Sequence, residues 1–247
     1  MSSRFTGRGM DISVVVPAYN EAKRLPVSLP LMYRALRRRF PFFEMIIVDD
    51  GSSDGTAEVV KVFSTEHPNV RLISYSVNRG KGYAVRQGVL ASSGKYVLFS
   101  DADQSTPMRE VRKLLKALEG CDVAIGSRAI RESRIAQYQP FYRVLMGKTF
   151  NKFVQLMTVP GIKDTQCGFK CFLGDTAREL FSLCRIDGFS FDVEVLYLAR
   201  RKGLRITEVG VYWRNSPESK VHPVWHSLQM LNDLLRIRCT TFLGGYS

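Results

Sequence analysis

The sequence predicts an α/β fold with a mostly parallel, twisted sheet flanked by helices. Five short runs of β-branched and other apolar residues lie in the first half of the chain, and helix-like segments separate them. Runs of this kind are typical of strands buried on both faces, as in a parallel sheet. Strand, helix and strand repeated in this way form a doubly wound layer. The predicted strands are residues 11–17, 44–48, 70–75, 95–100 and 121–126.

Helices are predicted between these strands from the spacing of apolar residues. Between the first two strands, apolar residues recur at intervals of three and four, the period of one helix face. These residues are Leu25, Leu29, Met32, Leu36 and Phe40. Residues 56–63, 83–91 and 107–118 show a similar pattern. Because ligands of such sheets bind beyond the carboxyl ends of the strands, we expect the site at that edge.

The second half of the chain is less regular, and basic amphipathic helices are predicted toward the C-terminus. Residues 138–159 and 189–201 are predicted as helices, 205–213 as a strand, and 225–238 as a final helix. The first of these helices has an apolar face formed by Tyr142, Met146, Phe150, Phe153 and Met157. Its polar face comprises Lys148, Asn151, Lys152 and Gln155.

A basic segment precedes and enters this helix. Residues 128–152 hold six basic residues and one acid, Glu132, and the helix follows a loop that looks disordered. A basic amphipathic helix suits a membrane interface, and the alternative is a solvated helix face over the core. The final helix is a second candidate for membrane contact through Trp225, Leu228, Leu231 and Leu235.

Composition indicates one globular domain with an anionic partner. The 247 residues are 45% hydrophobic, and no linker or repeat interrupts them, so residues 1–247 are taken as a single domain. The net charge of +13 indicates nucleic acid, phosphate or an acidic membrane as partner. The first ten residues have no apolar stretch of the signal-peptide type, and no run approaches the length of a spanning helix. The five cysteines fit no zinc spacing and are interpreted as reduced packing residues.

Polar residues follow four of the predicted strands, and all four clusters should converge on one edge of the sheet. They occupy residues 17–21, 49–55, 78–82 and 101–103. Each also has a purely structural interpretation: Asp49 and Asp50 could cap a turn, and Ser53 could cap the next helix. The glycine-rich segment 78–82 matches neither the Walker nor the Rossmann pattern.

The pair Asp101 and Asp103 gives the stronger indication of chemistry. In an extended chain, residues two apart point to the same side, so these carboxylates would repel each other without a cation nearby. Mg²⁺ and Mn²⁺ take such oxygens and share the rest of their shell with water and phosphates. The sequence therefore predicts a metal–diphosphate site directly after the fourth strand.

The strand-end motifs resemble those of a known family. VVVPAYNEAKRL, IIVDDGSSDGT, NRGKGYAVRQG and SDADQSTP, in this order, are similar to the inverting family-2 glycosyltransferases with the GT-A fold. In the second half, GSRA, GIKDTQCGFK, FDVEVLY and PESKV resemble the dolichyl-phosphate β-glucosyltransferases more closely than the corresponding mannosyltransferases. The resemblance implies a nucleotide-sugar-binding half at residues 11–126 and an acceptor- and membrane-facing half at residues 127–247.

The resemblance also implies roles for individual residues. Those matching the nucleotide-sugar site are Pro17, Tyr19, Glu21, Val48, Asp50, Lys81, Asp101, Ala102, Asp103, Arg214 and Lys220. Asp103 matches the metal ligand. Ser105 stands where mannosyl relatives place a second metal-facing residue, typically Gln, whereas this chain has Gln104 one position earlier. The expected catalytic residues are Asp103, Arg128, Asp164 and Asp192, and the acceptor-phosphate residues are Arg128 and Arg143.

These roles imply transfer of glucose from UDP-glucose to dolichyl or another polyprenyl phosphate, with inversion and with Mg²⁺ or Mn²⁺ as cofactor. The product, dolichyl β-D-glucosyl phosphate, would serve protein N-glycosylation. The acceptor phosphate is largely a dianion at neutral pH, so it needs positioning more than deprotonation. The expected location is peripheral, on the cytosolic face of the endoplasmic reticulum membrane, or of the plasma membrane in a prokaryote.

Other functions remain open at this stage. Mannosyl transfer from GDP-mannose to the same lipid is the nearest alternative, and a bacterial or archaeal polyprenyl-phosphate glycosyltransferase would look similar. A processive synthase is disfavoured, because its QxxRW motif is missing and Gln229 begins QMLND instead. A nucleic-acid-binding protein is disfavoured because strand-end carboxylates repel phosphate without a metal. A nucleotide-sugar binder without turnover is disfavoured by the presence of Asp103.

Overall fold

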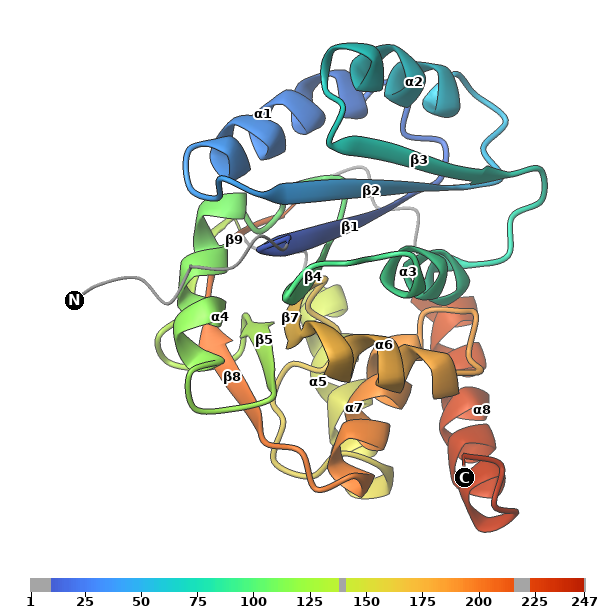
Figure 1. Cartoon of the computed structure of the whole chain (residues 1–247). Coiled ribbons are helices and arrows are strands. Elements are labelled where there is room, and N and C mark those ends of the chain that lie inside the picture. Colours follow the sequence, from blue (N-terminus) through green and yellow to red (C-terminus); the bar gives the residue numbers. More distant parts are fainter. Residues whose placement is uncertain (1–9, 138–140, 216–222, 247) are drawn as a thin grey trace.

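A computed structural model describes residues 10–137, 141–215 and 223–246. Its centre is a seven-stranded sheet with helices on both faces (Figure 1). The strand order is β3(Val70–Tyr75)-β2(Phe43–Asp50)-β1(Ile12–Ala18)-β4(Tyr96–Ser100)-β7(Phe169–Leu173)-β5(Val123–Ser127)-β8(Ile206–Gly210). β7 runs antiparallel to both of its neighbours, and the other pairs are parallel. The expected α/β fold with a mostly parallel sheet is confirmed.

The strands form because they bury side chains on both faces. In β1, Val14 and Val16 belong to the hydrophobic core on one face, and Val15 belongs to the core on the other. The first core is covered by α1 (Leu25–Arg37), α2 (Thr56–Glu66) and α4 (Val111–Ala117), the last preceded by a 3₁₀ turn (Met108–Glu110).

The opposite face is covered by α3 (Lys81–Leu90), α6 (Gly174–Leu183) and α7 (Phe191–Arg201). α5 (Phe141–Met157) and α8 (Pro223–Phe242) contact each other and contribute to the same core. α3 lies close to the sheet at Gly88, where an added Cβ would be 2.3 Å from a methyl carbon of Val15. Because α3 follows the carboxyl end of β3, its N-terminus lies at the carboxyl edge of the sheet, where the polar clusters lie.

The secondary structure of the second half differs from the prediction in three places. The strand expected at residues 205–213 is two strands, because β8 ends at Gly210 and β9 (Tyr212–Arg214) joins a different sheet. β9 pairs with β6 (Arg134–Gln137), in the segment expected to be a disordered-looking loop. β7 and α6 were not predicted at all. The sequence does not indicate β7 as an apolar run, because the charged Lys170 lies among its buried apolar residues.

Two predictions about side-chain packing also need correction. On α5, Phe153 was placed on the apolar face, yet it is 47% exposed, while Val154 is fully buried. Tyr142, Met146 and Phe150 have side chains outside the described part. Four of the five cysteines are buried and free, as expected, but Cys239 is exposed and is not a packing residue. Within the described ranges, none of the helices combines the length and apolar character that crossing a membrane requires.

Candidate functional site

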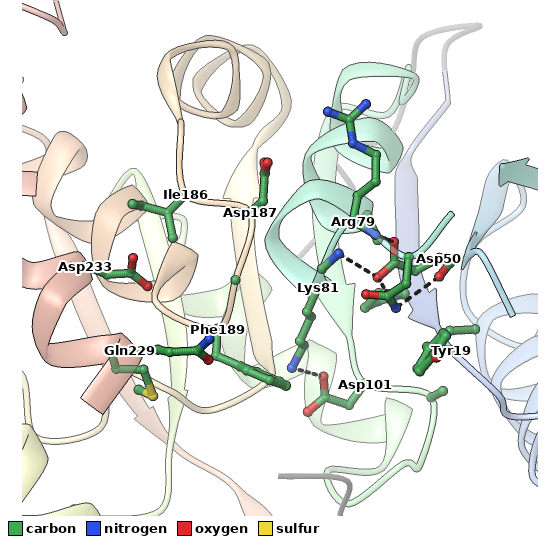
Figure 2. Close-up of a pocket in the computed structure, with 18 of the residues that line it drawn as sticks. Tyr19, Asp50, Arg79, Lys81, Asp101, Ile186, Asp187, Phe189, Gln229 and Asp233 are labelled. Atoms are coloured by element: carbon green, nitrogen blue, oxygen red, sulfur yellow. Dashed lines mark hydrogen bonds and ion pairs between the residues drawn. The ribbon is translucent and has the colours of Figure 1, made fainter. Parts of the chain in front are cut away.

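A cavity of about 850 Å³ lies at the carboxyl edge of the sheet (Figure 2). Each of the four polar clusters contributes to its wall, which confirms that they converge. Residues from the strand ends are Pro17, Ala18, Tyr19, Glu21, Arg24, Asp50, Asn78, Arg79, Gly80, Lys81, Asp101, Ala102 and Asp103. The cavity thus combines carboxylates and cations beside the N-terminus of a helix, a suitable environment for a phosphorylated ligand with a metal.

Asp50 fixes the glycine loop that leads into α3. Its Oδ1 accepts hydrogen bonds from the Tyr75 hydroxyl at 2.8 Å and the Arg79 N–H at 2.9 Å. Its Oδ2 accepts from the Asn78 amide at 3.0 Å and the Gly80 N–H at 2.9 Å. Gly80 has φ of 104°, a conformation that favours glycine. Asp50 therefore lines the cavity and also sets the position of Lys81, the first residue of α3.

The neighbouring polar residues have structural roles. Asp49 accepts hydrogen bonds from the Ser52 N–H and the Ser74 hydroxyl, so the turn-capping interpretation holds for this carboxylate. Ser53 does not cap α2, which begins at Thr56 after Gly55. The Ser53 N–H instead donates to the Asn20 side chain at 2.9 Å.

Lys81 and Asp101 form an ion pair of 2.6 Å at the centre of the cavity (Figure 2). Burial opposes the charge on Lys81, but Asp101 and Asp192 outweigh it and raise the pKa of the amine. The Asp101 carboxylate lies against Gly168, where an added Cβ would be 1.9 Å from Oδ2. Gly168 is therefore required to leave room for this carboxylate.

The chain from Asp101 to Gln104 is a turn and not an extended segment. The Gln104 N–H donates to the Asp101 carbonyl at 3.4 Å, and Gln104 has φ of 52°. The expectation that Asp101 and Asp103 share a side because the chain is extended was therefore wrong. Both residues nevertheless line the cavity, because the turn follows the end of β4 directly.

Ser105 supports Asp103. The Ser105 N–H donates to Asp103 Oδ1 at 2.8 Å, and its hydroxyl donates to Oδ2 at 2.9 Å. Ser105, proposed from the resemblance as a metal ligand, is not among the residues that line the cavity. Asp101 and Asp103 offer the hard oxygen ligands that Mg²⁺ and Mn²⁺ prefer, and one or two carboxylates suffice when phosphates complete the shell. Among the described residues, no group of three or more His, Cys, Asp or Glu could hold a metal without such help.

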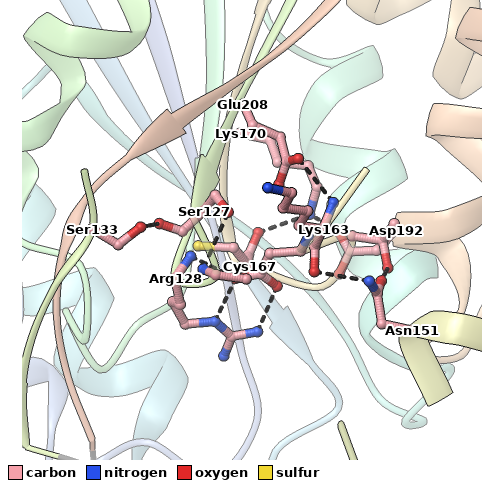
Figure 3. A network of polar contacts seen from close by, with 12 residues as sticks. Ser127, Arg128, Ser133, Asn151, Lys163, Cys167, Lys170, Asp192 and Glu208 are labelled. Atoms are coloured by element: carbon pink, nitrogen blue, oxygen red, sulfur yellow. Dashed lines mark hydrogen bonds and ion pairs between the residues drawn. The ribbon is translucent and has the colours of Figure 1, made fainter. Parts of the chain in front are cut away.

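Asp192 is buried and paired beneath the cavity. Its carboxylate forms an ion pair with Lys170, whose amine also donates to the Cys167 carbonyl at 2.7 Å (Figure 3). Burial raises the pKa of Asp192, and Lys170 and Lys81 oppose this effect. Asp192 does not line the cavity. In this arrangement it serves as a counter-charge, and a role as general base would require it to leave Lys170.

Arg128 and Asp164, both expected to be catalytic, are engaged with each other. Arg128 donates to Asp164 through Nε at 2.7 Å, Nη2 at 2.8 Å and its backbone N–H at 2.8 Å (Figure 3). Burial opposes the charge on Asp164, but Arg128 outweighs it and lowers the pKa of the carboxyl. Neither residue lines the cavity. A carboxylate held in this way is a poor base, whereas Arg128 uses only Nε and Nη2 on Asp164 and is 30% exposed, so its Nη1 remains able to donate to a phosphate.

The remaining predicted residues lie elsewhere. The Val48 side chain is fully buried in the core near Gly88 and does not line the cavity. Arg214 is exposed on β9, and its backbone N–H donates to the Ser105 carbonyl at 2.9 Å. Lys220 lies outside the described residues, as does the side chain of Arg143.

Part of the cavity wall was missed by sequence reasoning. It consists of the segment before α7 and one face of α8, and its residues are Arg185, Ile186, Asp187, Gly188, Phe189, Gln229, Met230, Asn232, Asp233 and Arg236. The signal on α8 was present as polar residues spaced by three, four and seven. The apolar residues of the same helix form the stronger pattern and indicate a packing role instead.

Sequence comparison identifies relatives over most of the chain. A model of the family described as Glycosyl transferase family 2 matches residues 13–181. The dolichyl-phosphate beta-glucosyltransferase of Dictyostelium discoideum is 42% identical over 94% of this chain and 75% of its own length. The protein of the same name from Homo sapiens is 40% identical over 95% of this chain and 77% of its own length.

Structural comparison finds the same architecture in solved enzymes. Glucosyl-3-phosphoglycerate synthase from Mycobacterium tuberculosis, in complex with Mn²⁺, UDP-glucose and phosphoglyceric acid, superposes with a TM-score of 0.69 at 22% identity. The match covers 93% of this chain and 80% of that one. Mannosyl-3-phosphoglycerate synthase from Rubrobacter xylanophilus superposes with a TM-score of 0.67 at 19% identity, and the match covers 95% of this chain and 75% of that one. At these identities the likeness is one of fold alone.

Proposed function

The chain belongs to glycosyl transferase family 2, and within it to the dolichyl-phosphate β-glucosyltransferases, so we propose that it transfers glucose from UDP-glucose to dolichyl phosphate. It has the GT-A fold that its sequence motifs imply. The product is dolichyl β-D-glucosyl phosphate, which serves protein N-glycosylation. The names of the relatives favour this reaction over mannosyl transfer from GDP-mannose.

The observation that carries the proposal is the position of Lys81 between carboxylates at the carboxyl edge of the sheet. Asp50 fixes the loop before Lys81, and Asp101 pairs with its amine. The nucleoside of the donor fits the part of the cavity lined by Pro17, Tyr19 and Asp50. Its diphosphate fits beside Lys81, whose ammonium attracts the phosphate oxygens and stabilises charge that develops on the leaving UDP.

A divalent cation fits the same place. Asp101 and Asp103 would hold Mg²⁺ or Mn²⁺, and Ser105 keeps the Asp103 carboxylate oriented. When bound, the metal supplies positive charge that neutralises the leaving diphosphate. Asp101, which pairs with Lys81 in the absence of a metal, would share its carboxylate with the cation, and the ammonium of Lys81 would then face the diphosphate.

The acceptor is a phosphate monoester that carries most of its charge without help from a base. Its second pKa lies near 6, so a positioned dianion can attack the anomeric carbon directly. The pairing of Asp164 with Arg128 and of Asp192 with Lys170 supports this route, because both carboxylates are engaged with a cation and neither lines the cavity. A single in-line displacement inverts the anomeric carbon and gives the β-linked product.

We infer peripheral membrane association from apolar side chains left exposed on α5, α8 and the residue that follows. They are Phe153, Leu156, Leu235, Phe242 and Leu243. Apolar side chains of this kind on helices of a chain with a net charge of +13 suit the surface of an anionic bilayer. Of the residues expected on the membrane face of α8, Leu231 instead packs against the core, and the side chains of Trp225 and Leu228 lie outside the described part. The proposed location is the cytosolic face of the endoplasmic reticulum, or of the plasma membrane in a prokaryote.

A lipid-transfer assay tests the proposal. The purified protein is incubated with Mn²⁺ or Mg²⁺, dolichyl phosphate in detergent, and radiolabelled UDP-glucose or GDP-mannose, and label is extracted into organic solvent. Lipid label is expected from UDP-glucose, lost with EDTA and with Asp103→Asn. Asp175→Asn is the matched control, because Asp175 is fully exposed on α6 and should transfer normally. Label from GDP-mannose alone would overturn the glucosyl assignment.

A further inference from the structure

The wall of the cavity opposite the strand ends has a different chemical character. α8 presents one polar face to it, formed by Gln229, Asn232, Asp233 and Arg236. These residues are spaced by three, four and seven, so they lie on the same side of the helix. Figure 2 shows Gln229 and Asp233 on the α8 side of the cavity, Tyr19 and Asp50 on the opposite side, and Lys81 with Asp101 between them.

This wall is held at a fixed position relative to Lys81. The Glu194 carboxylate accepts hydrogen bonds from the backbone N–H groups of Arg185 and Ile186, each at 2.9 Å, and from the Tyr246 hydroxyl at 2.5 Å. On the other side, an added Cβ at Gly80 would be 2.5 Å from the Asp187 carbonyl. The segment before α7 is thus fixed between Glu194 and the glycine loop, with Phe189 facing the cavity.

The groups on this wall are suited to a sugar. Hydroxyl groups both donate and accept hydrogen bonds, so the amides of Gln229 and Asn232 and the carboxylate of Asp233 can bind them. The Phe189 ring offers an apolar surface for the C–H face of a hexose. A dianionic phosphate is disfavoured directly beside Asp233 by like-charge repulsion, although Arg185 and Arg236 on the same wall attract anions. With the nucleoside and diphosphate assigned to the other wall, the hexose is the part of the donor left for this one.

We propose that Gln229 and Asp233 of α8, together with the ring of Phe189, bind the hexose of the nucleotide sugar and set donor selectivity. This inference rests on the proposed function, because it assigns the diphosphate to Lys81 and Asp103. It gives α8 two roles, since another side of the helix carries the exposed Leu235 and Phe242.

The test separates sugar recognition from nucleotide recognition. Dissociation constants for UDP-glucose and for UDP are measured by calorimetry, with Mn²⁺, on the wild type, Gln229→Ala and Asp233→Asn. We expect each variant to bind UDP-glucose about tenfold more weakly, as loss of one hydrogen bond to a charged or amide group implies, and UDP equally well. Arg238→Gln is the matched control, because Arg238 is exposed on α8 and does not line the cavity.

The other outcomes are decisive as well. If a variant weakens the binding of UDP and of UDP-glucose equally, the inference is overturned, and α8 contacts the nucleotide instead of the sugar. Unchanged donor binding with a raised KM for dolichyl phosphate would overturn it in favour of an acceptor site around Arg236. If the wild type binds GDP-mannose instead of UDP-glucose, the proposed function fails. In that case, measuring GDP-mannose and GDP on the same variants still decides whether α8 binds the hexose. Gln229 is exposed, so its variant is expected to fold even if Asp233→Asn does not.

Discussion

Lys170 and Asp192 form an ion pair that is enclosed by protein, with side chains 0% and 4% exposed. Lys170 is the second residue of β7, and Asp192 lies in the first turn of α7. The charge of Asp192 also reaches Lys81, and it contributes to raising the pKa of that amine. A buried pair in the core is therefore linked electrostatically to the cation that faces the diphosphate.

Lys170→Met should destabilise the protein strongly. The substitution leaves Asp192 buried without its counter-charge, which typically costs about 3–5 kcal/mol. The double variant Lys170→Met/Asp192→Leu removes both charges and should recover most of this loss. Urea unfolding of the three proteins measures the effect. A double variant as unstable as the single one would show that packing, and not charge, decides stability here.

Asp50→Asn should loosen the glycine loop. An amide keeps one acceptor oxygen and replaces the other by an NH₂ group, so the N–H of either Arg79 or Gly80 is left without an acceptor, at a cost of about 1–3 kcal/mol. Because Lys81 follows directly, donor affinity should fall together with stability. Asp49→Asn is the control: it changes contacts to Ser52 and Ser74, and Asp49 does not line the cavity, so it should lower stability and leave the dissociation constant for UDP-glucose unchanged.

Asp164 should make the free energy of unfolding depend on pH in the acidic range. An aspartate whose pKa is lowered by folding stabilises the folded state above its ordinary pKa of about 4, and this stabilisation is lost as the pH falls through the folded value. The free energy of unfolding of the wild type should therefore fall more steeply below pH 4 than that of Asp164→Asn. At pH 7 the variant should be about 1.5–3 kcal/mol less stable. Denaturation series between pH 7 and pH 3 compare the two, and parallel curves would contradict the prediction.

Tyr246→Phe should release the segment before α7. The Tyr246 hydroxyl donates to Glu194, which in turn holds the backbone of Arg185 and Ile186. Loss of one buried hydrogen bond to a charged group typically costs about 1.5–3 kcal/mol. Hydrogen exchange at the Ile186 amide should become faster, and the KM for UDP-glucose should rise. Exchange that is unchanged at Ile186 would show that Glu194 holds this segment without Tyr246.

The first half of the fold could be predicted from sequence because its strands are buried on both faces. The centres of β1 and β2 are therefore apolar runs, and their polar ends marked the edge of the sheet where the cavity lies. β7 could not be recognised, because the charge of Lys170 interrupts it and only the tertiary partner Asp192 explains why a lysine can be buried there. β6 has mostly exposed polar residues and gives no pattern.

The site was predicted less completely than the fold. Asp50, Lys81, Asp101 and Asp103 line the cavity as their positions after the strands suggested. The pairing of Arg128 with Asp164 could not be foreseen, because the two residues are 36 positions apart and meet only through the fold. Family resemblance assigns residue types to roles, but it does not show which charges are already neutralised by a neighbour.

The antiparallel strand β7 also determines the order in which the chain can assemble. β7 lies between β4 and β5, so β5 cannot take its place in the sheet until residues 169–173 have been synthesised. A nascent chain that ends before this point can pair β3, β2, β1 and β4, but the free edge of β4 stays open. An open edge of a buried strand invites pairing with another chain. The open edge therefore lasts for the translation of the 68 residues between β4 and β7. The first of these residues is Asp101 and the last is Gly168, so the carboxylate is synthesised long before the glycine that leaves room for it.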